Sequence, residues 1–237
     1  MHEPEAARRV RPHVARAVAL TKHVLLEFDG VMFDVETALG PWGRENAIGD
    51  FLRSRPYFPR PIMLGAYGPE HMLGFIAEHK PEYAAEAEQA LEHRELDAAL
   101  TSRPADGLRQ LLAACAATGR TVAVISDLAE DVVTTVVRSN ELSLHVNAIS
   151  ARQGFDLAGF RSGHAAHRAA ELLGVPIEAC LFVGGRSARI SSAREAGAVG
   201  LGCECGREPR KHLASPEIPV VPNLATLTKA LLSTPRP

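Results

Sequence analysis

Two carboxylates end an apolar run near the start of the chain. The stretch "VLLEFDG" at residues 24–30 places Glu27 and Asp29 two residues apart, with Gly30 directly after them. Uncharged β-branched and leucine residues before such a pair indicate a buried strand. By themselves, acids at a strand end fit two roles. They either cap nearby backbone amides or take part in a charged site.

Other polar and small residues follow apolar runs in the same way. Ser126 and then Asp127 follow "TVAVI", and Gly185 follows "CLFVG". Three arginines, at positions 161, 186 and 189, stand near predicted helix starts. They are either ordinary surface arginines or parts of an anion pocket, because guanidinium groups match phosphate and carboxylate geometry and a helix beginning near Ser187 offers free amides.

The elements that must position these residues alternate along the chain. We predict strands at 24–28, 121–126, 145–150, 180–184 and 198–202, and helices at 104–119, 127–140, 164–174, 187–197 and 223–232. This alternation predicts an α/β fold, with right-handed crossovers and a parallel sheet covered on both faces. Ligands of such sheets bind at the carboxyl ends of the strands, so the polar residues above are expected to gather there.

A segment of different character separates the first two strands. Residues 36–100 are broken by prolines, contain helical stretches at 69–80 and 81–100, and show no strand-like alternation. We expect a helical cap that lies over the sheet edge as a lid. The predicted organisation is an N-terminal tail at 1–20, an α/β core at 21–35 and 101–237, and the cap at 36–100.

Composition excludes several classes of partner. The chain of 237 residues has a net charge of −2, so it has no global basic field for nucleic acid. No apolar run reaches the roughly 20 residues that a membrane-spanning helix needs. The Arg-rich N-terminus is expected to be a tail or a short surface helix, with a nucleic-acid arm as the alternative. The cysteines at 115, 180, 203 and 205 are expected to be reduced thiols of a cytoplasmic protein, without a metal at "CEC".

Four blocks of the sequence resemble the motifs of the haloacid dehalogenase superfamily. They are "LLEFDGVMFD", "VAVISD", "GFRSGHAAHRAAELLGV" and "CLFVGGRSARISSAREAGA", and the resemblance covers roughly residues 20–230. It implies a Rossmann-like core with an inserted helical cap. For the phosphatases of the family it also implies a nucleophilic aspartate, a second aspartate as general acid/base, a serine or threonine, a lysine, and acids that hold Mg²⁺.

Only part of that site is present in this sequence. By the resemblance, Asp29 matches the acid/base position, Gly30 the glycine and Ser126 the second motif. Glu27 stands where the nucleophilic aspartate is expected. The departures in the third and fourth motifs are Phe160 at the lysine position with Arg161 beside it, Gly185 at the first metal acid and Arg189 near the second.

These departures predict a degenerate site. Glutamate is one methylene longer than aspartate, and a misplacement of about 1 Å can cost about 10²-fold in rate. Gly185 supplies no carboxylate for Mg²⁺ and Arg189 would repel the ion, so we expect no Mg²⁺ and an ion pair between Arg189 and Glu27. The candidate catalytic positions are Glu27, Asp29 and Ser126, and the candidate ligand-binding residues are Gly30, Asp127, Arg161, Gly185, Arg186 and Arg189.

The sequence leaves three functions open. The first is a pseudoenzyme that binds a small anionic ligand under the cap or a protein partner. The second is an active hydrolase of the same fold that uses Glu27 or Asp29 in an atypical site, with Mg²⁺ if it works as the phosphatases do. The third is a structural or regulatory subunit whose former site is filled by side chains. An empty polar cleft would favour a ligand, whereas a cleft filled by Arg189 and Phe160 would favour a subunit.

Overall fold

The structure is a computed structural model that describes residues 10–55, 68–155, 157–160, 162–205, 208–213 and 218–234. Its centre is a six-stranded sheet in the order β3-β2-β1-β4-β5-β6, and every neighbouring pair is parallel. The strands are β1 (His23–Glu27), β2 (Thr121–Ala129), β3 (Ala148–Arg152), β4 (Cys180–Gly184), β5 (Val199–Cys203) and β6 (Val220–Val221). The predicted α/β fold with a parallel sheet is therefore confirmed.

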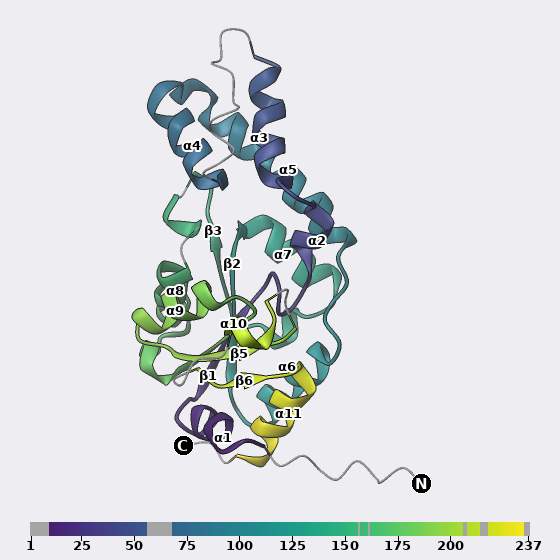
Figure 1. The fold of residues 1–237 in the computed structure, drawn as a ribbon, viewed down its shortest axis with the longest axis vertical. Coiled ribbons are helices and arrows are strands. Elements are labelled where there is room, and N and C mark those ends of the chain that lie inside the picture. The colour runs from purple at the N-terminus through teal and green to yellow at the C-terminus, as the bar shows by residue number, and fades with distance from the viewer. Residues whose placement is uncertain are drawn as a thin grey trace.

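Helices cover both faces of this sheet (Figure 1). One face packs against α1 (Pro12–Ala19), α6 (Leu108–Ala117), α7 (Glu130–Ser139) and α11 (Leu224–Ser233). The other face packs against α8 (Ser162–Leu173), α9 (Ser187–Glu195) and the short α10 (Arg210–Leu213). Alternate residues of β1 serve the two cores, with Leu26 in the first and Leu25 in the second, which is why its sequence is apolar without interruption.

Among the described residues, four further helices lie between β1 and β2. They are α2 (Val35–Leu39), α3 (Gly43–Arg53), α4 (Gly68–His79) and α5 (Ala84–Thr101). Helices α3, α4 and α5 share a small core of their own, made of Ile48, Leu52, Met72, Leu73, Ile76, Ala87 and Leu91. Figure 1 shows α3 and α4 at the end of the molecule beyond β2 and β3. We call α3, α4 and α5 the inserted helices.

Short 3-10 turns complete the connections, at Pro81–Tyr83, Ser143–His145, Leu157–Phe160 and Ile177–Ala179. None of the described helices is long and apolar enough to cross a membrane.

The structure differs from the sequence-based prediction at several elements, among them β3, which covers Ala148–Arg152 and not 145–150. Strand β2 continues to Ala129, with a register shift against β3 after Ile125, so α7 begins at Glu130 and not at Asp127. Strand β6 was not predicted, because two residues carry no periodicity. Residues 12–19, assigned to the tail, form α1, whose buried Val14 and Val18 join the main core.

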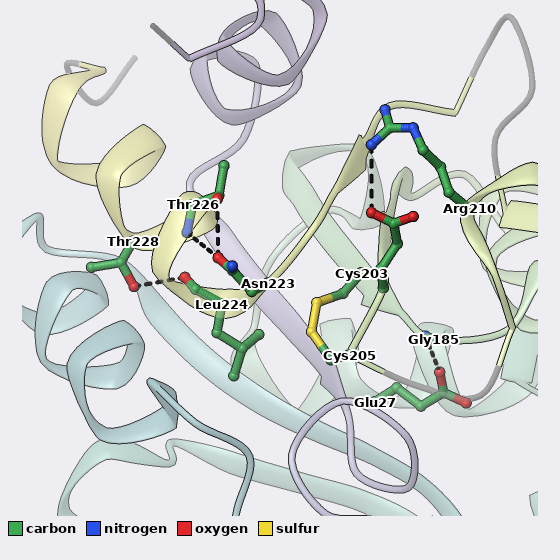
Figure 2. The surroundings of a disulfide bond; sticks show 10 residues. Glu27, Gly185, Cys203, Cys205, Arg210, Asn223, Leu224, Thr226 and Thr228 are labelled. Carbon is green, nitrogen blue, oxygen red and sulfur yellow. Dashed lines mark hydrogen bonds and ion pairs between the residues drawn. A yellow bond between two sulfur atoms is a disulfide. The ribbon is translucent and has the colours of Figure 1, made fainter. Parts of the chain in front are cut away.

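The expectation of four reduced thiols is also wrong. Cys203 and Cys205 form a disulfide at the carboxyl end of β5 (Figure 2). Cys115 and Cys180 are free and buried. The intervening residue allows the chain to turn back on itself, and the two Cα atoms lie 5.1 Å apart, within the range that disulfides span.

Candidate active site

Glu27 lies at the centre of the sheet edge, as the last residue of β1, and is only 1% exposed. Its Oε2 accepts a hydrogen bond of 2.7 Å from the backbone amide of Gly185, which follows the neighbouring strand β4 (Figure 2). Its Oε1 lies 2.9 Å from Nε of Arg189 and 3.5 Å from Nε of Arg186. The predicted pair between Arg189 and Glu27 is thus present: Oε2 accepts a hydrogen bond, and Oε1 faces both guanidinium groups as an ion pair without a hydrogen bond of its own.

Gly184 allows β4 and α9 to approach this carboxylate closely. A Cβ atom added to Gly184 would lie 3.3 Å from Oε2 of Glu27, 2.7 Å from the ring of Phe182 and 2.8 Å from Ile190. Any larger residue would therefore displace the side chains around Glu27.

Asp29 fills both roles that the sequence left open. Its Oδ1 accepts hydrogen bonds from the backbone amides of Val35 at 2.9 Å and Glu36 at 3.1 Å, at the start of α2. Its Oδ2 lies 3.0 Å from a terminal nitrogen of Arg186, and the other terminal nitrogen lies 3.2 Å from Oε2 of Glu36. Arg186 consequently joins Glu27, Asp29 and Glu36 within one cluster.

Asp127 joins the core to the inserted helices. Its Oδ2 lies 2.5 Å from a terminal nitrogen of Arg189 and 2.9 Å from one of Arg44, which belongs to α3. Nε of Arg44 lies 3.1 Å from Oε1 of Glu95 on α5. A single aspartate on β2 thus binds one arginine from α9 and one from the inserted helices.

The cluster continues behind Asp127 into the protein. Arg152, the last residue of β3, is 1% exposed and lies 2.7 Å from Glu95, with a second ion pair to Glu88. Its guanidinium carbon lies 4.9 Å from the ring centroid of Phe160. We call the whole assembly the arginine network; its arginines are Arg44, Arg152, Arg186 and Arg189, and its carboxylates are Glu27, Asp29, Glu36, Glu88, Glu95 and Asp127.

The acids of the network respond differently to this environment. Burial raises the pKa of Glu27, although Arg189 and Arg186 lie beside it, and burial likewise raises the pKa of Asp29. Burial also raises the pKa of Glu95 to about 7, against the opposing effect of Arg44. Burial alone would raise the pKa of Asp127 too, but Arg189 and Arg44 outweigh it and hold that pKa well below its ordinary value. Asp127 is therefore the acid that the arginines stabilise most strongly as an anion.

The remaining candidates have local structural roles. Oγ of Ser126 accepts a hydrogen bond of 3.1 Å from the amide of Leu128, within the irregular part of β2. Gly30 has a φ of 95° and donates to the carbonyl of Phe33, so it forms a tight turn that a residue with a side chain would strain. Arg161 lies outside the described residues.

Five members of the network were missed by sequence reasoning, namely Glu36, Arg44, Glu88, Glu95 and Arg152. Four of them lie on helices, where a charged residue usually marks a solvated face. The one available signal was the position of Arg152, just beyond the predicted end of a buried strand.

Among known proteins, this chain matches solved structures but no sequence family. No protein-family model and no curated protein sequence matches this chain. Solved structures do match. A haloacid dehalogenase-like hydrolase from Streptococcus pneumoniae is 15% identical, with a TM-score of 0.61 over 88% of this chain and 98% of that one. The protein has the haloacid dehalogenase fold.

Two other structures with this fold carry ligands. CbbY from Rhodobacter sphaeroides, solved with phosphate, is 16% identical, with a TM-score of 0.62 over 86% of this chain and 95% of that one. The L-2-haloacid dehalogenase from Xanthobacter autotrophicus, with chloropropionic acid covalently bound, is 17% identical, with a TM-score of 0.55 over 90% of this chain and 99% of that one. At these identities the likeness concerns the fold.

The resemblance implies Mg²⁺ for a phosphatase with the haloacid dehalogenase fold, but the residues at this edge do not suit the ion. Mg²⁺ requires oxygen ligands in near-octahedral arrangement. Both oxygens of Glu27 already have partners, Gly185 offers no carboxylate, and the guanidinium of Arg189 lies against Glu27. Within the described residues no group of three or more His, Cys, Asp or Glu side chains is arranged to hold a metal ion.

Proposed function

We propose that this protein is a pseudoenzyme with the haloacid dehalogenase fold, which has lost Mg²⁺-dependent phosphoryl transfer and acts by binding. The observation that carries the proposal is the engagement of Glu27. A nucleophilic carboxylate must present a free oxygen to the phosphorus atom, whereas here Oε2 accepts from Gly185 and Oε1 pairs with Arg189. Attack on a substrate would first require a buried ion pair to break.

The charge of the site supports the same conclusion. Phosphoryl transfer depends mainly on positioning and on neutralisation of charge by metal ions and cations. In this network the arginines are already neutralised by the carboxylates of the chain itself. An incoming phosphate ester would therefore compete with Glu27, Asp29 and Asp127 for Arg186 and Arg189.

The same competition argues against a small anion under the inserted helices and favours a protein partner. An anion would gain the arginines only by displacing buried carboxylates, which would be left without counter-charges. The surface above the site suits contact with a protein better. Trp42, the chain's single tryptophan, is 62% exposed at the start of α3. It lines a cavity of about 430 Å³ that combines apolar residues such as Leu39 and Pro41 with the charged Glu36, Arg44 and Glu45. We propose a regulatory or structural role.

Turnover of a generic aryl phosphate, with and without Mg²⁺, tests the proposal. We expect wild type and Asp29→Asn to show the same background rate, because the carboxylate takes no part in chemistry. Turnover that requires both Asp29 and Glu27 would overturn the proposal and establish the atypical hydrolase instead.

The position of Trp42 allows the binding mode to be tested separately. Titration of inorganic phosphate is expected to leave the fluorescence of Trp42 unchanged. A saturable change that Arg186→Gln abolishes would show that the former active site binds an anion.

A further inference from the structure

A second cationic site lies far from the arginine network. A cavity of about 700 Å³ is bounded by α1, the end of α9 and the strands β5 and β6. Figure 1 shows α1 at the opposite end of the molecule from α3 and α4. Among the described residues that line the cavity, the charged or titratable ones are Arg11, His13, Arg16, Arg194 and Arg210, and none is an aspartate or glutamate. We call this cavity the cationic groove.

The Arg-rich segment at the N-terminus supplies half of its charge. Helix α1 buries Val14, Ala17 and Val18 against the core, which leaves Arg11 and Arg16 exposed. The amphipathic pattern thus fixes the helix on the sheet by its apolar side and presents the arginines on another side. The arginines that the sequence placed in a tail consequently belong to a formed surface.

The core supplies the other two arginines of the groove, Arg194 and Arg210, of which Arg210 is paired with Glu204. A Cβ added to Gly200 would lie 2.7 Å from both Cγ and Cδ of Arg194 and 2.8 Å from Cγ2 of the buried Ile190, so the glycine leaves room for both side chains of α9 over β5. Gly200 does not have a positive φ, so its backbone conformation does not require glycine. The lack of space for a side chain is the reason for glycine at this position. Arg210 donates to the carbonyl of Val220 at 3.4 Å and lies 3.5 Å from Glu204, and these contacts hold it at the groove.

We propose that the cationic groove binds a small ligand that carries two or more phosphate groups. Guanidinium groups bind phosphate oxygens in a bidentate manner, and several of them here face one cavity. The volume falls within the roughly 300–1,000 Å³ typical of small-molecule sites. Ala17, Ile218 and Val220 provide an apolar wall for the uncharged part of the ligand.

A small ligand accounts for the site better than a nucleic acid. The described lining of the cavity carries four arginines and no acid, while the chain as a whole has a net charge of −2. A nucleic acid depends on phosphate contacts along an extended basic surface, whereas a small ligand can be held within the cavity alone.

Calorimetric titration of tripolyphosphate into the full-length protein at low ionic strength tests the proposal. We expect one site per chain. Arg11→Glu and Arg16→Glu should each weaken binding by about tenfold or more, since each removes charged hydrogen bonds to phosphate. The matched control is Arg138→Glu, an exposed arginine on α7, which packs on β2 and β3 at the opposite edge of the sheet from β5 and β6. It should leave the affinity unchanged.

A second variant tests the geometry without changing the charge. Arg194→Lys keeps the charge but removes the planar guanidinium, so it should weaken tripolyphosphate binding, with an unchanged circular dichroism spectrum as the check on folding. The proposal is overturned if tripolyphosphate does not bind, if Arg138→Glu weakens binding as much as Arg16→Glu, or if citrate binds equally well. An oligonucleotide whose affinity grows with its length and exceeds that of tripolyphosphate would also overturn it, in favour of nucleic acid.

Discussion

Nε of Arg189 lies 2.9 Å from Oε1 of Glu27, so a cation that belongs to the chain itself stands against the carboxylate at the end of β1. The same guanidinium reaches Asp127 on β2 at 2.5 Å. Arg189 therefore bridges the carboxyl ends of two neighbouring strands. A bound cation could be exchanged with solvent, whereas this guanidinium remains in place as long as α9 is folded.

Replacement of Arg189 by methionine tests how strongly this bridge supports the fold. Arg189→Met leaves Glu27 and Asp127 buried with one counter-charge fewer, and we expect the free energy of unfolding to fall by about 3–5 kcal/mol. Chemical denaturation measures the change. The exposed Arg138→Met serves as control and should stay within about 0.5 kcal/mol of wild type.

A change of Glu27 shows whether the loss of stability in Arg189→Met comes from the ion pair between Arg189 and Glu27. Adding Glu27→Gln to Arg189→Met should restore part of the lost stability, because the uncompensated buried charge is then removed. Strict additivity of the two single changes would contradict the coupling that the geometry indicates.

The pH dependence of stability should identify Asp127. Its folded-state pKa lies well below the ordinary 3.8, since Arg189 and Arg44 outweigh the effect of burial. A carboxylate with a lowered pKa contributes stability above its unfolded pKa and loses it as the pH falls through the folded pKa. We expect Asp127→Asn to be less stable than wild type at pH 7 and this difference to shrink below about pH 3.8.

Urea titrations at a series of pH values measure this effect. A difference between Asp127→Asn and wild type that stays constant from neutral to acidic pH would mean that Asp127 is not held as an anion. Asp131→Asn is a suitable control, because Asp131 is exposed in the first turn of α7.

The fold could be predicted because its signals are local. Apolar β-branched runs mark β1, β2 and β4, and glycines such as Gly174 and Gly197 end the helices between them. The pair between Arg189 and Glu27 was predicted from the charge balance of the motifs. Charge balance identifies which groups must pair, although it gives no distance.

The part of the network that faces the inserted helices could not be predicted in this way. Arg44 and Glu95 lie 51 residues apart on α3 and α5, and Asp127 lies further along on β2. Only the packing of the inserted helices against the sheet makes these residues neighbours. The disulfide could not be predicted for another reason. The spacing of Cys203 and Cys205 in the sequence does not determine whether their thiols are oxidised.

Arg44 should hold the inserted helices against the core. It contributes the ion pairs of α3 to Asp127 at 2.9 Å and to Glu95 at 3.1 Å. We expect Arg44→Ala to lower the free energy of unfolding by about 2 kcal/mol and to increase amide hydrogen exchange in α3 and α5 more than in α6. Arg53→Ala is the control on the same helix, because the Arg53 side chain is 59% exposed. Equal exchange in α3 for both variants would show that Arg44 does not fasten the helix.

A restored set of carboxylates should create the metal site that the wild-type residues do not offer. The triple variant Glu27→Asp, Gly185→Asp and Arg189→Ala shortens the first acid, adds a carboxylate after β4 and removes the cation between them. Gly185 does not have a positive φ, so aspartate can adopt its backbone conformation. Because a ligand stabilises the state that binds it, Mg²⁺ at 100 times its Kd should raise the free energy of unfolding by about 2.7 kcal/mol. Wild type and Arg189→Ala alone should show no such dependence on Mg²⁺ in thermal unfolding. Equal stabilisation of wild type and the triple variant by Mg²⁺ would contradict the view that Arg189 and Gly185 prevent the ion from binding.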